Sequence, residues 1–372
     1  MNLLYISNLS NNIDAGLNWS VPASVKAQQK YDNVLWVDIT KGAFQKHWGE
    51  VKAYHNLKEY GEKLCLNILP APFNRPDCVV FEGFYYLGHV MFAKELKRKG
   101  VPYIIIPRSA FTRAAFSNGF FLKRFKKKVA HLLIFDNYVR NAHAIQYLTE
   151  EEKKESEYKY KLNSYILPNG MNTPKMTKSS FTDGIKCVFI GRQDIYQKGL
   201  DLLLEAIKVV GDELRNEGFT LDIYGPPRYD VKKVSELIRE YNIWDIVKNH
   251  EVGVRGEEKE NVLLQSDVFF LTSRFEGHPM GLIEALSYGV PSFVTRGSNM
   301  FDEINNYKAG WVSENSKDAI VVSLRKMLKD KKRFHEFGKN AKDLANTYNW
   351  DSLASRFHEI VVNMNARLTN KH

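Results

Sequence analysis

The sequence lacks several features that would place the protein in a special class. No run approaches the roughly 20 apolar residues that a membrane-spanning helix needs. The start, MNLLYISNLS, lacks the charged and apolar regions of a signal peptide, so we expect a cytoplasmic protein. Internal repeats and low-complexity segments are also missing. These absences favour an ordinary globular protein.

Cysteine and metal-binding patterns are scarce as well. The three cysteines, Cys65, Cys78 and Cys187, are scattered and form no CxxC pair. This spacing argues against a disulfide framework and against a zinc site, so we expect inert thiols. The sequence also shows no obvious Asp-x-Asp metal site. We therefore expect neither a metal ion nor a cofactor.

Length and charge bound the remaining classes. A chain of 372 residues with 44% apolar composition favours about two domains with sizeable cores. The net charge of +10 is uneven, because residues 1–170 hold 24 Lys and Arg against 15 Asp and Glu, whereas the remainder holds 29 against 28. A basic first half implies an anionic partner such as membrane lipid, a lipid phosphate or nucleic acid. No nucleic-acid-binding motif accompanies it, so we expect no nucleic-acid partner.

Residues 266–295, SDVFFLTSRFEGHPMGLIEALSYGVPSFVT, are the most informative stretch. The pattern predicts a strand at Asp267–Thr272, a helix from Pro279 or Met280 to Gly289, and a strand at Val290–Thr295. Glu276 precedes the helix and Glu284 lies about one turn inside it, and helical side chains lean toward the N-terminus. Both carboxylates can then face the bare N–H groups of the first turn, which suit a phosphate. A nucleotide sugar fits this arrangement; solvated glutamates in an ordinary βαβ unit are the alternative.

A second strand-to-helix turn carries two cations. A strand is expected at Lys186–Ile190; Arg192 follows it, and Lys198 stands six residues later, ahead of an amphipathic helix. Arginine can grip a diphosphate bidentately, and lysine can neutralise it as a point charge. The turn therefore predicts a diphosphate site, although two surface cations near a turn would give the same pattern.

The chain opens with a βαβ pattern. Strands are expected at Asn2–Ser7 and Asn33–Ile39, with a helix beginning near Ser20 between them. This order predicts a Rossmann-like sheet. Gly16, in the loop after the first strand, would let the backbone approach a ligand closely, or would serve a plain turn.

The spacing Glu276-x7-Glu284 in EGHPMGLIEAL, together with Arg192-x5-Lys198, resembles the signature of the retaining glycosyltransferases of family 4. The resemblance implies an α/β fold of the GT-B type, with two Rossmann-like domains facing across a cleft and a C-terminal helix that crosses back to the first domain. The implied divisions are an acceptor-side domain at 1–170 with the helix 350–372, a linker at 171–184, and a nucleotide-sugar-binding domain at 185–349. The polar composition of MNTPKMTKSSFTDG is typical of a linker.

The resemblance also implies residue roles. Arg192 and Lys198 would neutralise the donor diphosphate, Glu276 would bind the transferred sugar and Glu284 the ribose, so Glu276, Arg192 and Lys198 are the predicted catalytic residues. Backbone groups of the loop with Val254 and Gly256 would hold the base. The other predicted donor contacts are Gly16, Lys259, Gly277, His278, Pro279, Met280, Gly281 and Leu282, with Asn299 and Glu303 as further candidates. Side chains alone do not identify the base, because backbone groups read it.

One departure from the family pattern concerns the strand that ends IIIP. Many family members have His-Gly there, whereas this chain has Pro107-Arg108-Ser109 and is more similar to relatives in surface-polysaccharide pathways that have Arg-Gly. Arg108 would then contact an acceptor phosphate or the donor sugar. A structural ion pair is the alternative role for this arginine.

Two basic segments stand out in the first half. Lys123, Arg124, Lys126, Lys127 and Lys128 alternate with aromatic and apolar residues. This segment predicts a basic amphipathic helix on an anionic membrane surface, with a solvated helix face as the alternative. Lys94, Lys97, Arg98 and Lys99 end a helix expected over EGFYYLGHVMFAKELKRKG, where basic residues suit the helix C-terminus.

The sequence therefore predicts an enzyme, a metal-independent hexosyltransferase that retains anomeric configuration. It would transfer sugar from a nucleotide-diphosphate sugar to a glycan or lipid-linked acceptor in surface polysaccharide synthesis, in the cytoplasm or peripherally on the inner face of the membrane. A nucleotide-sugar epimerase of the same fold and a non-catalytic nucleotide-sugar- or glycan-binding protein are the alternatives.

Overall fold

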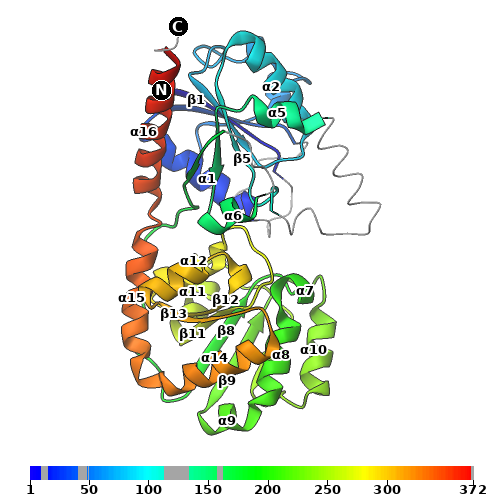
Figure 1. The fold of residues 1–372 in the computed structure, drawn as a ribbon, viewed down its shortest axis with the longest axis vertical. Coiled ribbons are helices and arrows are strands. Elements are labelled where there is room, and N and C mark those ends of the chain that lie inside the picture. Colours follow the sequence, from blue (N-terminus) through cyan, green and yellow to red (C-terminus); the bar gives the residue numbers. More distant parts are fainter. Residues whose placement is uncertain (10–15, 41–47, 49, 113–133, 157–161, 370–372) are drawn as a thin grey trace. The chain divides into compact units, whose positions relative to one another are not determined.

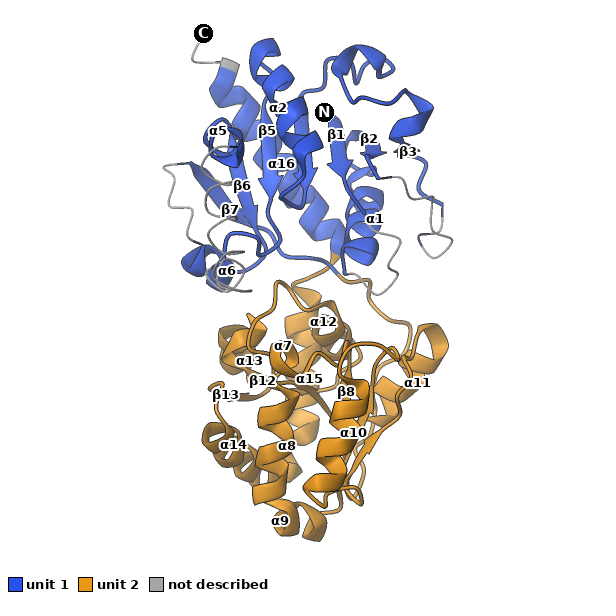
Figure 2. Ribbon diagram, turned by 90° about the vertical axis from the view of Figure 1, so that its right-hand side faces the viewer, with its two compact units in different colours: residues 1–170, 350–372 blue, residues 171–349 orange. Residues whose placement is uncertain are grey.

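The structure is a computed structural model that describes residues 1–9, 16–40, 48, 50–112, 134–156 and 162–369. The chain forms two compact units (Figure 2). Unit 1 comprises Met1–Gly170 and Trp350–His372, and unit 2 comprises Met171–Asn349. The helix-containing C-terminus thus belongs to unit 1, although it follows unit 2 in the sequence.

Within the described residues of unit 1, seven parallel strands form one sheet in the order β3-β2-β1-β4-β5-β6-β7. Figure 1 labels β1 and β5 of this sheet. The strands are β1 (Asn2–Ser7), β2 (Asn33–Asp38), β3 (Tyr54–Asn56), β4 (Cys78–Glu82), β5 (Tyr103–Ile106), β6 (Ala144–Tyr147) and β7 (Asn163–Ile166). The helices are α1 (Leu17–Gln28), α2 (Leu87–Lys99), α5 (Asp136–Arg140), α6 (Glu150–Glu155) and α16 (Trp350–Thr369), with 3₁₀ turns η2 (Leu57–Glu59) and η3 (Leu66–Ile68). Near-continuous apolar strands such as YIII suit a sheet covered on both faces.

Unit 2, all of whose residues are described, has a six-stranded parallel sheet in the order β10-β9-β8-β11-β12-β13. The strands are β8 (Ile185–Ile190), β9 (Phe219–Tyr224), β10 (Val247–Asn249), β11 (Val268–Leu271), β12 (Ser292–Thr295) and β13 (Gly310–Ser313). The helices are α7 (Ile195–Lys198), α8 (Leu200–Val209), α9 (Gly211–Asn216), α10 (Val231–Glu240), α11 (Gly256–Gln265), α12 (Met280–Ser287), α13 (Phe301–Tyr307), α14 (Lys317–Lys329) and α15 (Phe334–Asn346), with 3₁₀ turns η5 (Arg296–Ser298) and η6 (Lys331–Arg333).

Helix α16 completes the core of unit 1. Its residues Leu353, Phe357 and Val361 are buried with the side chains of β1, β2 and α1. Gly170, at the end of the first segment of the unit, packs against the Trp350 ring, and a Cβ at Gly170 would lie 2.3 Å from that ring. The chain re-enters unit 1 at Trp350, so the packing of this ring on Gly170 fixes the first turn of α16.

The segment interpreted as a linker lies along unit 2. Met171 N–H donates to Tyr348 O at 2.6 Å, and Lys178 N–H donates to Tyr288 O at 2.7 Å. The Lys178 ammonium also lies 3.1 Å from the buried carboxylate of Asp267. Residues 171–184 are thus held by backbone and charged contacts within this unit.

Two predicted helix starts are wrong. The helix expected over EGFYYLGHVMFAKELKRKG begins only at Leu87, because Glu82 ends β4 and Gly83 has a left-handed backbone (φ 85°). Helix α1 begins at Leu17 with Gly16 as its N-cap, and Ser20 lies inside the helix, where its hydroxyl donates to Gly16 O at 3.1 Å. Serine can bond back to the carbonyl four residues earlier, so its presence does not require a cap. Among the described helices, none combines the length and apolarity that crossing a membrane demands.

Candidate functional site

The strand order of unit 2 defines where a ligand can bind. Strands β8 and β11 are neighbours, but the chain leaves β8 toward β9 on one side, and β12 lies on the other side of β11. In open parallel sheets, ligands bind at such a switch point, outside the carboxyl ends of the strands. The segments that follow these two strands are 191–199 and 272–280, which carry the two predicted motifs.

Gly199 lets the backbones of the two segments pack closely against each other. Its backbone is left-handed (φ 61°), and a Cβ there would lie 2.1 Å from the carbonyl oxygen of Thr272. The Thr272 hydroxyl donates to Lys198 O at 3.0 Å. Only glycine allows this approach without strain, and the approach places Lys198 beside the end of β11.

Lys198 and Glu276 form an ion pair at this junction. Their side chains are only 11% and 10% exposed, and the Ser273 hydroxyl donates to Glu276 Oε1 at 2.6 Å. Asn299 (φ 57°) donates from its amide to the carbonyl oxygens of Glu276 and Gly277, the latter at 3.2 Å. Lys198, the lysine predicted to bind the diphosphate, therefore has Glu276 as a carboxylate partner. Asn299 holds the backbone of the loop that carries Glu276.

Arg192 occupies the turn after β8. Its Nη2 donates to Gln197 Oε1 at 3.3 Å, and its guanidinium carbon lies 5.5 Å from the centre of the Tyr229 ring. Tyr229 is 48% exposed and has a left-handed backbone (φ 62°). The neighbouring Asp230 accepts from Ile195 N–H at 2.9 Å, which joins the turn after β9 to the segment after β8. The aromatic ring thus lies beside a cation that, among the residues the structure describes, forms no ion pair.

Helix α12 begins at the same edge of the sheet. Pro279 precedes it and has no side-chain acceptor for the first-turn N–H groups. Leu282 and Ile283 N–H donate to Pro279 O at 3.0 and 3.2 Å, so Met280 and Gly281 are the first helical N–H groups. Gly281 packs against Ile190 O at the end of β8, 3.6 Å from a Cβ placed there. The positive end of the helix dipole therefore adjoins the turn that carries Arg192.

Glu284 has a different lysine partner. Its carboxylate pairs with Lys259 of α11, and the side chains are 25% and 20% exposed. Burial, with the charges of Glu260 and Glu284, raises the pKa of Tyr288 to about 12. Glu276 and Glu284 are therefore held by separate cations, each of which would have to share its carboxylate with a ligand hydroxyl.

The predicted base loop lies beside the end of β9. Gly225 N–H donates to Val252 O at 2.9 Å, and a Cβ at Gly225 would lie 2.3 Å from Gly191 O. Val254 is buried, whereas Gly256 (φ 52°) has no atom within 4 Å of a Cβ position. The loop is thus anchored through its backbone to the turn before Arg192.

His278 is buried with its ring 5.1 Å from the ring of Tyr348. Its side chain therefore contributes to the packing of unit 2, and its backbone remains part of the loop before α12. Glu303 lies in the first turn of α13.

Arg108 and Gly16 belong to unit 1. Arg108, which has a left-handed backbone (φ 52°), donates from Nε to Glu82 Oε2 at 2.9 Å. Its Nη1 donates to Ser20 Oγ at 3.1 Å and to Asn169 Oδ1 at 2.8 Å. The side chain of Arg108 is 11% exposed, and its guanidinium joins β4, α1 and the segment after β7. This geometry is the structural ion pair, the alternative role for Arg108. A Cβ at Gly16 would meet no atom within 4 Å.

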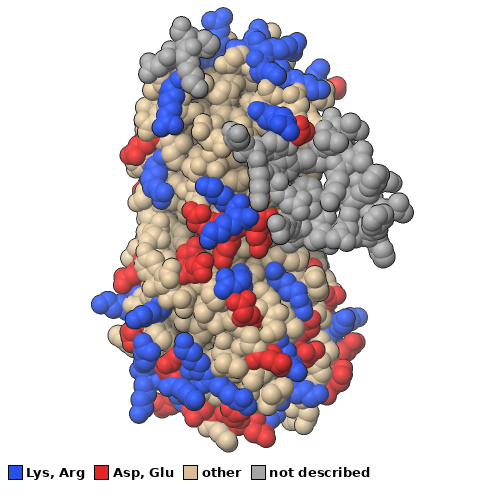
Figure 3. Space-filling model, viewed as in Figure 1, with Lys and Arg blue, Asp and Glu red and all other residues tan. Residues whose placement is uncertain are grey.

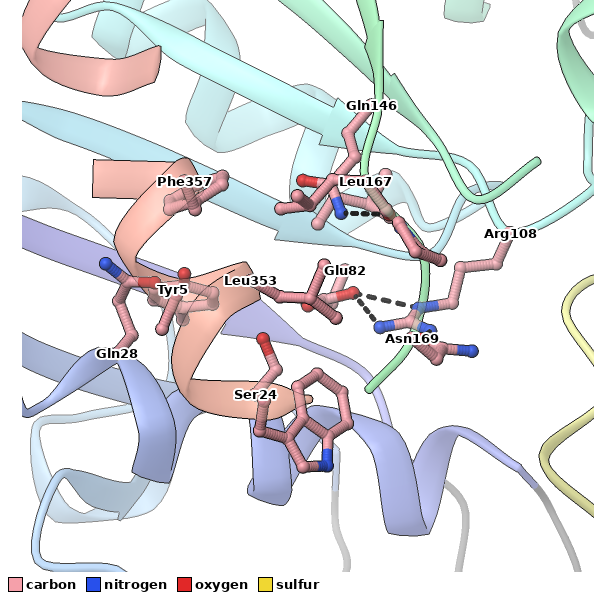
Figure 4. Close-up of a pocket in the computed structure, with 14 residues that line it drawn as sticks. Tyr5, Ser24, Gln28, Glu82, Arg108, Gln146, Leu167, Asn169, Leu353 and Phe357 are labelled. Atoms are coloured by element: carbon pink, nitrogen blue, oxygen red, sulfur yellow. Dashed lines mark hydrogen bonds and ion pairs between the residues drawn. The ribbon is translucent and has the colours of Figure 1, made fainter. Parts of the chain in front are cut away.

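A small cavity lies beside this ion pair (Figure 4). Tyr5, Gln146 and Phe357 line it from β1, β6 and α16. Glu82 is buried, and within the described residues its Oε1 has no hydrogen-bond partner. An ordered water commonly satisfies a carboxylate oxygen in such a cavity.

The predicted membrane segment with Lys123, Arg124, Lys126, Lys127 and Lys128 lies outside the described residues. Three residues that contact the predicted catalytic side chains were not predicted from the sequence: Tyr229, Ser273 and Gln197. No motif marks these residues, because their contacts arise from strand order and loop packing.

Comparisons with known proteins bear on the family and on the fold. Residues 174–344 match the model of the family described as Glycosyl transferases group 1, so the chain contains a glycosyl transferases group 1 domain. Protein CapJ from Staphylococcus aureus is 24% identical over 256 residues, which cover 66% of this chain and 62% of CapJ. The putative colanic acid biosynthesis glycosyltransferase WcaL from Escherichia coli (strain K12) is 29% identical over 137 residues, or 34% of this chain and 32% of WcaL.

The chain spans between 22% and 62% of the length of the curated relatives that it matches. The crystal structure of Anabaena Alr3699/HepE in complex with UDP and glucose is similar with a TM-score of 0.71 and 14% identity, covering 98% of this chain and 100% of that chain. The structural neighbours are GT-B glycosyltransferases, which confirms the predicted α/β GT-B fold.

Proposed function

We propose that this chain, with its glycosyl transferases group 1 domain at residues 174–344, transfers a sugar from a nucleotide-diphosphate sugar to a glycan or lipid-linked acceptor. The observation that carries the proposal is the grouping at the carboxyl edge of unit 2. There the Lys198–Glu276 pair lies between the ends of β8 and β11, beside Arg192 and the first turn of α12. Cations, bare N–H groups and carboxylates at one switch point suit a diphosphate that bears hydroxyl-rich groups.

The donor would be held by three kinds of contact. Arg192, Lys198 and the N–H groups of Met280 and Gly281 would bind the diphosphate and stabilise the charge that grows on it as it leaves. Glu276 would accept from hydroxyls of the transferred sugar and Glu284 from the ribose. The loop containing Val254 and Gly256 would hold the base through backbone groups. No metal is required in this scheme because the protein supplies the compensating charge.

The reaction would be a substitution at the anomeric carbon. The bond from that carbon to the diphosphate oxygen breaks, and a bond to an acceptor hydroxyl oxygen forms on the same face. The proton of the acceptor hydroxyl passes to the departing phosphate, so the protein needs no separate base. The contribution of Glu276 is positioning, since holding the donor in one pose lowers the entropic part of the barrier.

The descriptions of two similar proteins support the proposed pathway and the proposed donor. WcaL is described as a putative colanic acid biosynthesis glycosyltransferase, which agrees with a role in surface polysaccharide synthesis. The HepE crystals contained UDP and glucose, which agrees with a nucleotide-sugar donor. From the resemblance of Arg192-x5-Lys198 and Glu276-x7-Glu284 to the retaining family, we propose that transfer retains anomeric configuration. From the basic charge of residues 1–170, we propose that the protein works in the cytoplasm, at or near the membrane.

The test has two steps. A thermal-shift screen of nucleoside diphosphates and their sugars identifies the donor, because a bound ligand raises the melting temperature by mass action. NMR of the product formed from that donor then gives the configuration of the new glycosidic bond. A retained configuration supports the proposal, and an inverted one refutes retention. If the donor is isomerised in the absence of acceptor, the protein is instead an epimerase. If a donor binds but is not turned over, the protein is a binding protein.

A further inference from the structure

Four of the eight residues that line a groove in unit 1 are cations. Lys63 forms one wall with Leu64, and α2 forms the other with Met91, Lys94, Lys97 and Arg98. Figure 3 shows lysine and arginine side chains gathered over the end of unit 1 where α2 lies in Figure 1. The groove is separate from the arginine-containing cavity of the same unit.

The groove follows from the amphipathic character of α2. Val90, Phe92, Ala93 and Leu96 face the core of unit 1. The opposite face presents Leu87, Met91, Lys94 and Arg98, whose spacings of four, three and four residues place them in one stripe. Glu95 Oε1 accepts from Leu66 N–H at 3.3 Å, which holds the segment with Lys63 against the helix.

The groove carries an excess of positive charge. Within the described residues, Lys63, Lys94, Lys97 and Arg98 have no ion-pair partner, and one acidic side chain of the lining, Glu95, offsets one of these four charges while it accepts from a backbone N–H. The helix dipole accounts for cations in the last turn of α2. It does not account for Lys63, which is on another segment, or for Lys94, which precedes that turn.

Exposed apolar side chains continue the same stripe. Leu87 is 59% exposed and Met91 is 54% exposed, although both are apolar. No aromatic ring lines the groove, so it lacks the platform on which sugar rings usually stack. Flexible basic side chains beside exposed apolar ones are instead typical of a surface that lies on anionic lipid.

We propose that this face of α2, with Lys63, is a docking surface for an anionic membrane. Lipid phosphates would occupy the groove between Lys63 and the helix, and Leu87 and Met91 would enter the boundary between headgroups and acyl chains. The proposal does not depend on the transfer reaction, because the surface lies in unit 1 and uses none of the donor-site residues. It is also independent of the basic segment at 123–128.

The experiment is co-sedimentation of the full chain with vesicles of phosphatidylcholine alone or with 30 mol% phosphatidylglycerol. The groove variant carries Lys63→Gln, Lys94→Gln, Lys97→Gln and Arg98→Gln. The control variant carries the same change at four exposed lysines of unit 2, Lys232, Lys233, Lys332 and Lys339. A third variant carries Leu87→Gln and Met91→Gln.

The native chain should bind the anionic vesicles and not the neutral ones, and 0.5 M NaCl should weaken binding. Each cation near such a surface contributes about a fivefold factor in affinity, so the groove variant should bind at least 50-fold more weakly, whereas the control should bind within about threefold of the native chain. The Leu87 and Met91 variant should bind more weakly and keep its salt dependence.

The proposal is overturned if the native chain does not bind anionic vesicles, or if the groove and control variants lose affinity equally. It is also overturned if a polyanionic polysaccharide binds the groove and anionic vesicles do not. Far-UV circular dichroism and melting temperature establish that each variant is folded before the comparison is made.

Discussion

The pairing of Lys198 with Glu276 leads to a prediction in which two similar substitutions change the affinity for a nucleoside diphosphate in opposite directions. In the ligand-free chain, Glu276 competes for the ammonium that a diphosphate would bind. Replacing Glu276 by Gln removes the competing charge and keeps a side chain of similar shape. We expect Glu276→Gln to bind a nucleoside diphosphate more tightly than the native chain while transferring sugar more slowly, because the sugar hydroxyls lose a carboxylate acceptor.

The magnitude follows from the burial of the pair. Both side chains are about nine-tenths buried, so solvent screens the interaction only in part. A hydrogen bond to a charged group contributes about 1.5–3 kcal/mol and a neutral one about 0.5–1.5 kcal/mol. Changing the competitor from carboxylate to amide therefore releases about 1–1.5 kcal/mol, which corresponds to roughly tenfold tighter binding.

Isothermal titration calorimetry with the nucleoside diphosphate found in the thermal-shift screen measures this change. Glu284→Gln is the matched control, because it removes one carboxylate from the same helix region but leaves the Lys198 pair intact. We expect this control to bind about tenfold more weakly, since the ribose loses a charged acceptor. Equal weakening in both variants, or no change in Glu276→Gln, would refute the competition that we infer.

Three further predictions concern other parts of the chain. Gly199→Ala should lower the free energy of unfolding of unit 2 in urea by at least about 3 kcal/mol, because its Cβ would lie 2.1 Å from Thr272 O. The control Gly256→Ala, which has open space around its Cβ, should cost only about 1–2 kcal/mol. Similar costs for the two variants would contradict this prediction. Tyr229→Ala should weaken nucleoside diphosphate binding about threefold, because the ring lies beside Arg192, whereas Tyr229→Phe should keep the native affinity. An equal loss of affinity in both variants would show that the hydroxyl, and not the ring, matters. Burial lowers the pKa of His89 to about 3, below the ~6.5 of an unfolded histidine, so its stabilisation is present above pH ~6.5 and decreases as the pH falls toward 3. Between pH 7.5 and 5.5 the native chain should lose about 1.4 kcal/mol more than His89→Leu in urea unfolding, and equal losses would show that His89 is accessible to protons.

Much of the fold could be predicted from sequence periodicity. β1 has the predicted bounds, β8 begins one residue before its predicted start, and α12 begins at Met280. These elements are strongly apolar or follow a clear stop signal, so local pattern and tertiary packing agree. The start of α1 was predicted wrongly because Ser20 bonds back within the helix and Pro22 lies in its interior. Packing of α1 against β2 and α16 outweighs the local signal there.

The candidate site could be predicted in its residue types but not in its contacts. The sequence indicated that Lys198 and Glu276 belong to one site, yet their ion pair joins residues 78 positions apart. It forms because β8 and β11 are neighbours, which only the strand order shows. Tyr229 reaches Arg192 in the same way. The groove beside α2 also depends on a contact between distant segments, so its cations look like a plain helix end in the sequence.

The central claim is that unit 2 binds the diphosphate of a nucleotide sugar through Arg192 and Lys198. Its most direct test is calorimetric titration of the native chain and of the double variant Arg192→Ala, Lys198→Ala with uridine, guanosine and adenosine diphosphates. At least one nucleotide should bind the native chain with a one-to-one stoichiometry and bind the double variant at least 50-fold more weakly, because two charged contacts are lost. Undiminished binding by the double variant, or no binding of any nucleotide by the native chain, would contradict the claim.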